Sequence, residues 1–363
     1  MSPELHDRPS NMSRRRVWMF VILAAVSIAL GALYATLAKR RVPSGASGAP
    51  AASTSALAPP PADLQQRPHV VFLSAAPATW GRVLVADPGV PAAPRYVTDL
   101  VCDRVHVAAG HGVCLTVDDA ILGRYRVDLF DGSFRRVRSL PLPGYPSRAR
   151  VSPDGRYGAF TVFVSGHSYA VTGFSTRTEI LDLAAGESFG DLETFRISRG
   201  GERLAAPDFN FWGVTFVGES PRFYATLATG GRTYLIEGDV TTRSAVALRE
   251  NAECPSVSPD GTRVVFKRRL ATFANLRWQL TVLDLRTQQE TPLAAESSSV
   301  DDQAEWLDAE QIVYGIPDRS GRAADSPDLW VVRADGTGAP QLFLPDAASP
   351  AVVRGVSLVS GRR

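Results

Sequence analysis

A pair of short apolar runs recurs six times along the chain, and this repeat constrains the fold more than any other feature. The first run of each pair is anchored at one apolar residue, and successive anchors are 43, 45, 65, 41 and 48 residues apart. The anchors are Phe72, Leu115, Phe160, Ala225, Phe266 and Tyr314. A period of about 40 to 50 residues is that of a four-stranded propeller blade. The repeat therefore predicts six similar sheets.

The second run of each pair carries an acidic residue and a polar turn, as in YRVDLFDGS (125–133) and LTVLDLRTQQ (280–289). Clusters of Gly, Pro, Asp and Ser separate the runs, and such residues form the turns of β-hairpins. No stretch of this region keeps a helical period of 3.6 residues for a dozen positions. We predict an all-β, six-bladed β-propeller over residues 69–358.

The N-terminal part of the chain has a different character. Residues 17–38 form an apolar stretch of 22 residues without a charge, long enough to cross a bilayer as one helix. A cleaved signal peptide is the alternative, but its apolar core is shorter and ends at a small-residue cleavage site. Here the stretch continues directly into Lys39, Arg40 and Arg41. We therefore predict an uncleaved transmembrane signal-anchor.

Basic residues lie on both sides of this stretch and are slightly more numerous before it. A first helix with a short basic head usually keeps that head in the cytoplasm, so residues 1–16 are expected to be a short cytoplasmic tail. Residues 39–68 are rich in Pro, Ala and Ser and are expected to be a disordered linker. The prediction is a single-pass membrane protein with an extracytoplasmic C-terminal domain.

Charge and cysteine content narrow the candidate partners. The chain has 39 basic and 37 acidic residues and a net charge of +2, which gives no large positive field for nucleic acid. Cys102 and Cys114 flank a tight connection and are a possible disulfide in an oxidising compartment, with Cys254 left unpaired. Three separately buried thiols are the alternative. No zinc or other cofactor motif is present, and we predict a monomer without cofactors.

Two segments carry the most specific local motif: RARVSPDGRYGAF (148–160) and CPSVSPDGTRVVF (254–266). In each, Ser-Pro-Asp-Gly joins two strands, with proline presetting φ at the second turn position and glycine accepting positive φ at the last. Residues 304–315 and 215–227 are degraded copies. On these repeats the chain resembles the TolB-like six-bladed β-propellers, including membrane-tethered bacterial proteins of this fold without an established activity.

The resemblance spans roughly residues 69–345 and implies a toroid of four-stranded blades with WD40-like repeats. It implies loops at two rims and along a central channel that are available for protein binding, and it implies no chemistry. The long interval between Phe160 and Ala225 holds about one extra hairpin, within 190–213. Insertions in repeat folds usually lie in rim loops, often on the binding face.

Four residues are the candidate partner-binding set: Phe209, Phe211, Trp212 and His167. The three aromatic residues end the insertion, and the alternative is that they begin the inner strand of the next blade and pack between sheets. His167 follows a first-run strand and is expected near a rim. The segment Gly-His-Ser-Tyr-Ala (166–170) contains His167 and superficially resembles a nucleophile elbow, a strand-to-helix turn that exposes a serine. No helix is predicted after it, so this interpretation is not favoured.

No catalytic constellation remains once the six repeats are assigned, so the chain is predicted not to be an enzyme. The prediction is a non-catalytic binding or scaffolding module for proteins, peptides or envelope components. The alternative is an extracytoplasmic enzyme or metal-dependent sensor whose polar residues meet only in three dimensions at a channel mouth. The alternative would gather these residues: His106, His111, His167, Asp118, Asp119, Asp301 and Asp302.

Overall fold

A computed structural model describes residues 57–89, 95–119, 122–164, 175–272, 275–317 and 326–355. The predicted transmembrane segment 17–38 lies outside these residues. Within them, no helix combines the length and the apolar character that crossing a bilayer requires.

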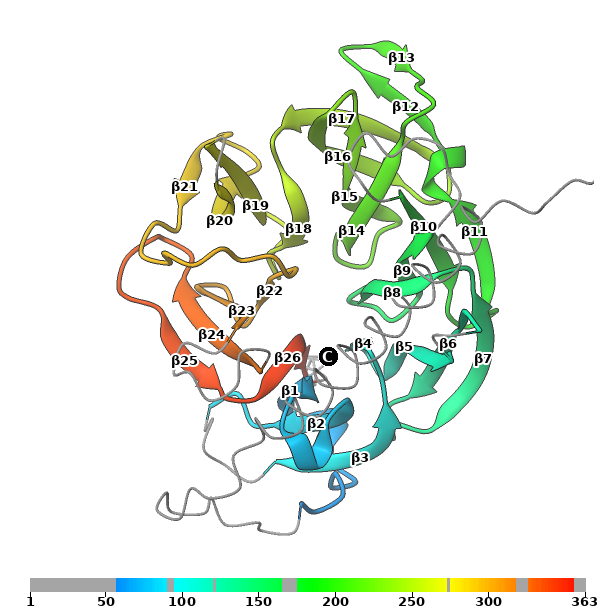
Figure 1. Cartoon of the computed structure of the whole chain (residues 1–363), viewed down its shortest axis with the longest axis vertical. Helices are drawn as coiled ribbons and strands as arrows, with labels where there is room; N and C mark the ends of the chain where they lie inside the picture. The colour runs from blue at the N-terminus through cyan, green and yellow to red at the C-terminus, as the bar shows by residue number, and fades with distance from the viewer. Residues whose placement is uncertain are drawn as a thin grey trace, which may run out of the picture. The chain divides into compact units, whose positions relative to one another are not determined.

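In the described residues, six sheets succeed one another around a ring, as the repeat predicted (Figure 1), and all their strand pairs but one are antiparallel. Blade 1 contains β26 (Ala347–Arg354), β1 (Pro68–Ser74), β2 (Arg82–Ala86) and β3 (Tyr96–Val101). Blade 2 contains β4 (Arg104–Ala108), β5 (His111–Asp119), β6 (Arg124–Asp131) and β7 (Arg136–Leu142). Blade 3 contains β8 (Tyr145–Val151), β9 (Tyr157–Val164), β10 (Ser175–Asp182) and β11 (Glu187–Asp191).

Blade 4 is a six-stranded sheet of β14 (Asn210–Phe216), β15 (Arg222–Thr229), β16 (Arg232–Asp239), β17 (Ser244–Glu250), β12 (Arg196–Arg199) and β13 (Glu202–Leu204). Blade 5 contains β18 (Glu253–Val257), β19 (Arg263–Thr272), β20 (Asn275–Asp284) and β21 (Glu290–Pro292). Blade 6 contains β22 (Glu305–Trp306), β23 (Gln311–Pro317), β24 (Pro327–Arg333) and β25 (Gln341–Leu344). Three short 3₁₀ helices are η1 (Leu64–Gln66), η2 (Pro77–Thr79) and η3 (Leu192–Thr194).

The six anchors of the repeat all lie in the second strand of a blade, counted from the axis, and all are buried. The second apolar runs form the third strands, from β2 in blade 1 to β24 in blade 6. These two strands are covered by neighbouring blades on both faces, so each contains a run of buried apolar residues, such as residues 70–73 in β1 and 312–314 in β23. This burial explains why the repeat is visible in the sequence.

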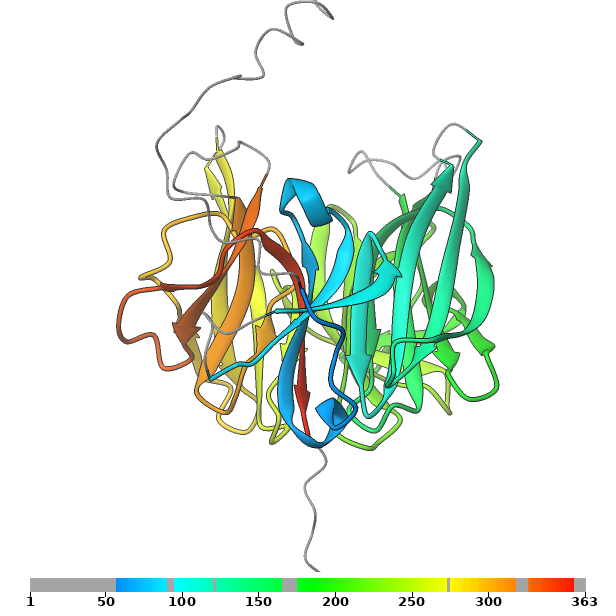
Figure 2. The same cartoon turned by 90° about the horizontal axis from the view of Figure 1, so that it is seen from below.

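The ring closes through the C-terminal strand. β26 pairs antiparallel with β1, from Pro68 opposite Arg354 to Ser74 opposite Ala347. It thereby supplies the innermost strand of the first blade. Each innermost strand then contacts the next, from β26 through β4, β8, β14, β18 and β22 back to β26. Figure 2 shows the same ring from the side, with the strands running between its two faces.

The two Ser-Pro-Asp-Gly motifs form the predicted turns between first and second strands. In blade 3 the Gly155 N–H donates to the Ser152 carbonyl at 2.8 Å, and Gly155 has a φ of +73°. In blade 5 the Gly261 N–H donates to the Ser258 carbonyl at 2.9 Å, with a φ of +71°. In both turns the serine hydroxyl donates to the aspartate carboxylate. The positive φ at the last turn position is confirmed.

The end of the predicted linker is ordered in the structure, which corrects the expectation of disorder for residues 57–68. Leu57 packs against the apolar cluster between blades 6 and 1, and Ala58 forms a parallel bridge with Tyr96. Leu64 in η1 is buried in the cluster between blades 1 and 2. These apolar contacts offset the entropy of ordering a segment that composition alone assigned to the linker.

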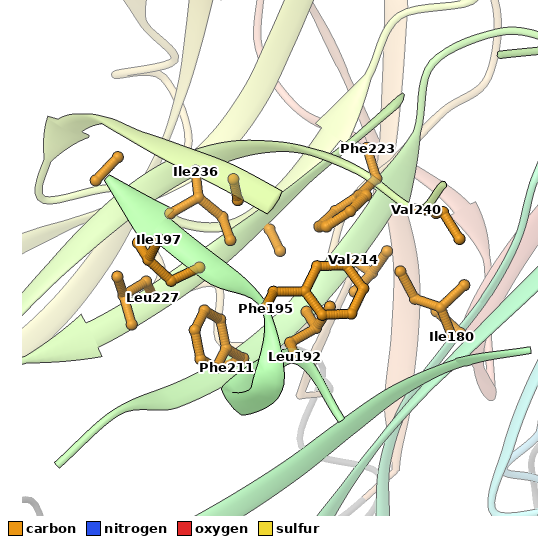
Figure 3. Close-up of a cluster of buried hydrophobic side chains, with 14 of the residues drawn as sticks. Ile180, Leu192, Phe195, Ile197, Phe211, Val214, Phe223, Leu227, Ile236 and Val240 are labelled. Atoms are coloured by element: carbon orange, nitrogen blue, oxygen red, sulfur yellow. The ribbon is translucent and has the colours of Figure 1, made fainter. Parts of the chain in front are cut away.

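The insertion in blade 4 extends the outer edge of its sheet and does not form a loop at the rim of the channel. β12 pairs in parallel with the outer strand β17, from Arg196 opposite Ser244 to Ser198 opposite Val246. The backbone of β17 offers an edge for this pairing. Leu192, Phe195 and Ile197 then pack into the cluster between blades 3 and 4 (Figure 3).

We expect the two turn glycines to differ in their sensitivity to substitution. Gly261→Ala should cost about 1 kcal/mol, since φ is positive and the nearest atom to a new Cβ is a Val217 methyl at 3.7 Å. Gly155→Ala should cost more, because its Cβ would also lie 2.8 Å from the His111 ring and 3.2 Å from Ala109 Cβ. Denaturant unfolding of both variants measures the difference; equal costs would contradict the blade 2 contact.

Candidate functional site

A cavity of about 780 Å³ opens at one end of the ring axis, and we call it the funnel. Every innermost strand contributes to its wall. The contributions include His106 from β4, Arg150 from β8, Thr215 from β14, Ser256 from β18, Glu305 from β22 and Val352 from β26. Both Ser-Pro-Asp-Gly turns lie at its mouth, through Pro153 and Pro259. The funnel is therefore a composite site that exists only in the closed ring.

A second cavity, of about 600 Å³, is lined by the other ends of the innermost strands β4, β8 and β26 and by residues of blades 5 and 6, among them Trp278 and Ile316. Along β8 the order is Arg148 in this opposite pocket and then Arg150 in the funnel. Along β4 it is Arg104 and then His106. The two pockets therefore lie at opposite ends of one axis, separated by charged side chains that we call the septum: Arg104, His106, Arg148, Arg150, Asp302 and Glu305.

The floor of the funnel is a buried cluster of three side chains. The Arg150 guanidinium donates from Nη1 to Glu305 Oε2, and Nη2 donates to the Ala304 carbonyl at 3.3 Å. His106 Nδ1 accepts from the Val151 N–H at 3.1 Å. His106 Nε2 lies 3.0 Å from Arg150 Nη1 and 3.7 Å from Glu305 Oε2. Both ring nitrogens of His106 therefore face N–H donors, and Arg150 Nη1 contacts the imidazole as well as the carboxylate.

Burial and neighbouring charge keep His106 neutral. Its pKa lies well below the ordinary value of 6.5, first because burial disfavours the charged ring and then because Arg150 and Arg354 repel it. Burial also lowers the pKa of Arg150 to about 10, although Asp302 opposes the shift. Arg150 still carries its charge at neutral pH. The floor accordingly holds one cation, one carboxylate and a neutral imidazole.

The septum is anchored at the opposite pocket by a second set of ion pairs. Arg148 Nη1 lies 3.5 Å from Asp302 Oδ1, and its Nη2 donates to the Asp301 carbonyl at 2.9 Å. Burial alone would raise the pKa of Asp302, but Arg148 and Arg104 hold it below the usual range. Lys267 Nζ lies 2.9 Å from the Asp301 carboxylate and 4.9 Å from the Trp278 ring centroid.

Phe211 and Trp212 lie in β14 and Phe209 directly precedes it, and all three aromatic candidates are buried, as the alternative interpretation described. Phe209 is 9% exposed, Phe211 1% and Trp212 8%. The Phe209 and Phe211 rings make an edge contact at 5.8 Å. Because these side chains fill the interior beside the innermost strand of blade 4, they offer little surface to a partner. The fourth candidate, His167, lies outside the described residues.

The histidines and aspartates named for a metal or catalytic site do not gather in one place. Asp301 and Asp302 line the opposite pocket, whereas His106 faces the funnel. Asp118 pairs with Arg126 in blade 2, and Asp119 pairs with Arg124. Within the described part of the chain, no group of three or more His, Cys, Asp or Glu side chains could hold a metal ion.

Cys102 and Cys114 form a disulfide in the structure, and Cys254 is a buried free thiol. Cys102 follows the outermost strand of blade 1, and Cys114 lies in the second strand of blade 2. The bond therefore joins two successive blades across the short hairpin of β4 and β5.

Four charged residues that matter most for the site were not singled out from the sequence: Arg148, Arg150, Glu305 and Arg354. Arg148 and Arg150 directly precede the first Ser-Pro-Asp-Gly motif, and their spacing of two placed both on one face of the incoming strand. This spacing could have identified the two arginines from the sequence. No sequence pattern identifies Glu305 or Arg354, because their partners Arg150 and Trp306 lie far away along the chain.

No protein-family model matches the chain, and no curated protein matches it. Solved structures do share the fold. TolB from Acinetobacter baumannii superposes with a TM-score of 0.54 at 16% identity over 78% of this chain and 66% of that chain. A chain of a nidogen/laminin complex gives 0.52 at 10% identity over 80% and 99%. A putative TolB from Agrobacterium tumefaciens gives 0.46 at 11% identity over 77% and 88%.

These likenesses concern the fold alone, at identities where function does not transfer. The protein is a six-bladed β-propeller. More particularly, its fold is the TolB-like one that the repeat motif indicated. The chain spans 66% of the length of the A. baumannii TolB chain.

We expect the free energy of unfolding to fall as the pH drops from about 7.5 to about 5.5. Burial lowers the pKa of both His69 and His106 below 6.5 in the folded chain. The unfolded chain therefore binds protons that the folded chain does not. This stabilisation is complete above pH 6.5 and is lost below it, with a slope of up to about 1.4 kcal/mol per pH unit for each histidine.

Urea unfolding at three pH values, compared between the wild type and His106→Gln, tests this dependence. The variant should lose about half of the slope and keep the part that His69 provides. A slope unchanged in the variant would show that His106 accepts a proton in the folded state.

Proposed function

We propose that the protein is a membrane-anchored extracytoplasmic propeller that binds a segment of a protein or peptide in the funnel without catalysing a reaction. The observation that carries this proposal is the composite wall of the funnel, to which all six innermost strands contribute. A volume of about 780 Å³ falls in the range of ligand sites. The TolB-like fold is consistent with a binding module.

The chemistry of the wall fits an extended peptide segment. Ala109, Val257 and Pro259 provide apolar surface, and Gln65 and Glu219 provide polar groups among them. Arg354 is an exposed guanidinium in this wall, with Nη2 donating to the Trp306 carbonyl at 2.6 Å. A mainly apolar wall with a few fixed polar groups is the usual composition of a site that orients its ligand.

The floor supports binding over catalysis. Glu305 is held by Arg150, and the His106 ring is held by the Val151 N–H. A general base must reach a substrate proton with a free lone pair or carboxylate oxygen, whereas here Glu305 Oε2 accepts from Arg150 and both ring nitrogens of His106 face N–H donors. We assign the floor the role of closing the inner end of the funnel and setting the charge there.

The membrane anchor is proposed from the apolar stretch 17–38 and the basic residues before it. The full-length protein should stay in the membrane fraction after alkaline carbonate washing, and deletion of 17–38 should release it. Deletion of 42–55 from the linker is the matched control and should leave the protein in the membrane. A phosphatase reporter after Arg363 should be active, since it would be extracytoplasmic; an inactive reporter would reverse the orientation.

Site-specific photocrosslinking in cells of the native host tests the binding site. A photoreactive residue at Glu219, exposed at the funnel mouth, should capture a discrete partner. The same residue at Glu202, exposed on β13 at the outer edge of blade 4, should not.

Ala108→Trp, which places an indole in the funnel wall, should abolish the capture at Glu219 while the melting temperature is retained. Val137→Trp on the exposed outer strand β7 is the control. Capture that survives Ala108→Trp, or that is equal at Glu202, would contradict binding in the funnel.

A further inference from the structure

A small cavity of about 20 Å³ lies within the septum, between the funnel and the opposite pocket. Its wall includes Arg104 from β4, Arg148 and Arg150 from β8, and Asp302. Ser349 and Pro350 of the closing strand β26 complete it on another side. A volume of this size accommodates one particle about as large as a water molecule.

Two guanidinium N–H groups at this cavity have no hydrogen-bond partner. Arg148 Nε and Arg150 Nε are both buried and unpaired. The Arg150 side chain is only 8% exposed, and its Nη1 and Nη2 are already used by Glu305 and the Ala304 carbonyl. Buried polar groups in folded proteins are almost always satisfied, so an acceptor is missing from this place.

The charges around the cavity do not balance. Three guanidinium groups face the septum, and the carboxylates that offset them are Asp302 and Glu305. His106 adds no negative charge, and the Asp301 carboxylate pairs with Lys267. One positive charge thus remains uncompensated in a cluster where Arg104 and Arg148 are half-buried and Arg150 is buried, and a poorly solvated charge without a counter-ion is costly.

We propose that the septum binds a monoatomic anion, chloride, in this cavity between Arg104, Arg148 and Arg150. Chloride accepts from several N–H donors at once and brings no proton of its own. A water molecule would satisfy the donors and leave the charge uncompensated. Sulfate and phosphate are too large for the cavity. The ion would tie β4, β8 and the segment that precedes β22 together at the level where the channel closes.

Thermal unfolding of the full-length protein in detergent tests the proposal at constant ionic strength, with sodium chloride exchanged for sodium gluconate. The melting temperature should rise by about 1 to 3 °C between about 1 and 100 mM chloride, because a ligand that binds only the folded state stabilises it. Bromide should replace chloride. A crystal grown in bromide should show an anomalous peak in the cavity.

Two variants change the net charge of the septum, one by removing positive charge and one by removing negative charge. Arg104→Gln removes the excess positive charge and should abolish the chloride dependence. Asp302→Asn adds to the excess, so its half-maximal effect should need several-fold less chloride. Arg135→Gln, an exposed arginine paired with Asp131 in blade 2, is the control and should behave as the wild type.

A melting temperature that is the same in chloride and in gluconate, together with no bromide peak in the cavity, would overturn the proposal and assign the cavity to water. A chloride effect that is equal in Arg104→Gln and in the wild type would also overturn it, since the ion would then bind elsewhere.

Discussion

The pairing of β26 with β1 is the constraint on which the ring depends. Residues of β26 alternate between its two faces: Ala351 and Val353 join the cluster between blades 1 and 2, whereas Val352 joins the cluster between blades 6 and 1. One strand at the end of the chain thus seals two interfaces at once. Without it, β1 would expose an unpaired edge and the innermost wall would lack one of its six strands. The funnel and the septum would lose their common wall.

Each innermost strand has one face toward the channel axis and the other toward the apolar space between blades, and its sequence alternates accordingly. In β8 the side chains of Arg148 and Arg150 face the axis, whereas Ala149 and Val151 pack between blades 2 and 3. Buried ion pairs contribute little net stability, because desolvation offsets most of their attraction. Their effect here is geometric: they close the channel at mid-height, so that a ligand entering the funnel meets a polar floor.

The sequence predicted the strands that are buried on both faces and missed those that are not. The runs around Phe72 and Tyr314 are apolar throughout, so their period revealed the six blades. The innermost strands β4 and β22 are short and partly charged, and no apolar run marks them. The position of β12 beside β17 was unpredictable, since a parallel pairing of distant segments depends on the assembled sheet. Phe211 and Trp212 were ambiguous because apolar character does not distinguish a buried side chain from a docking surface.

The place of β1 in its sheet also determines how the domain carries a mechanical load. β1 is bonded on both sides, to β2 and to β26, and the hydrogen bonds of antiparallel strands run perpendicular to the strand. A pull on the N-terminal end of β1 therefore acts along the strand and shears two ladders together. The two ladders therefore share the load, and a pull transmitted through residues 57–67 reaches the ring at a strand that is bonded along both of its edges.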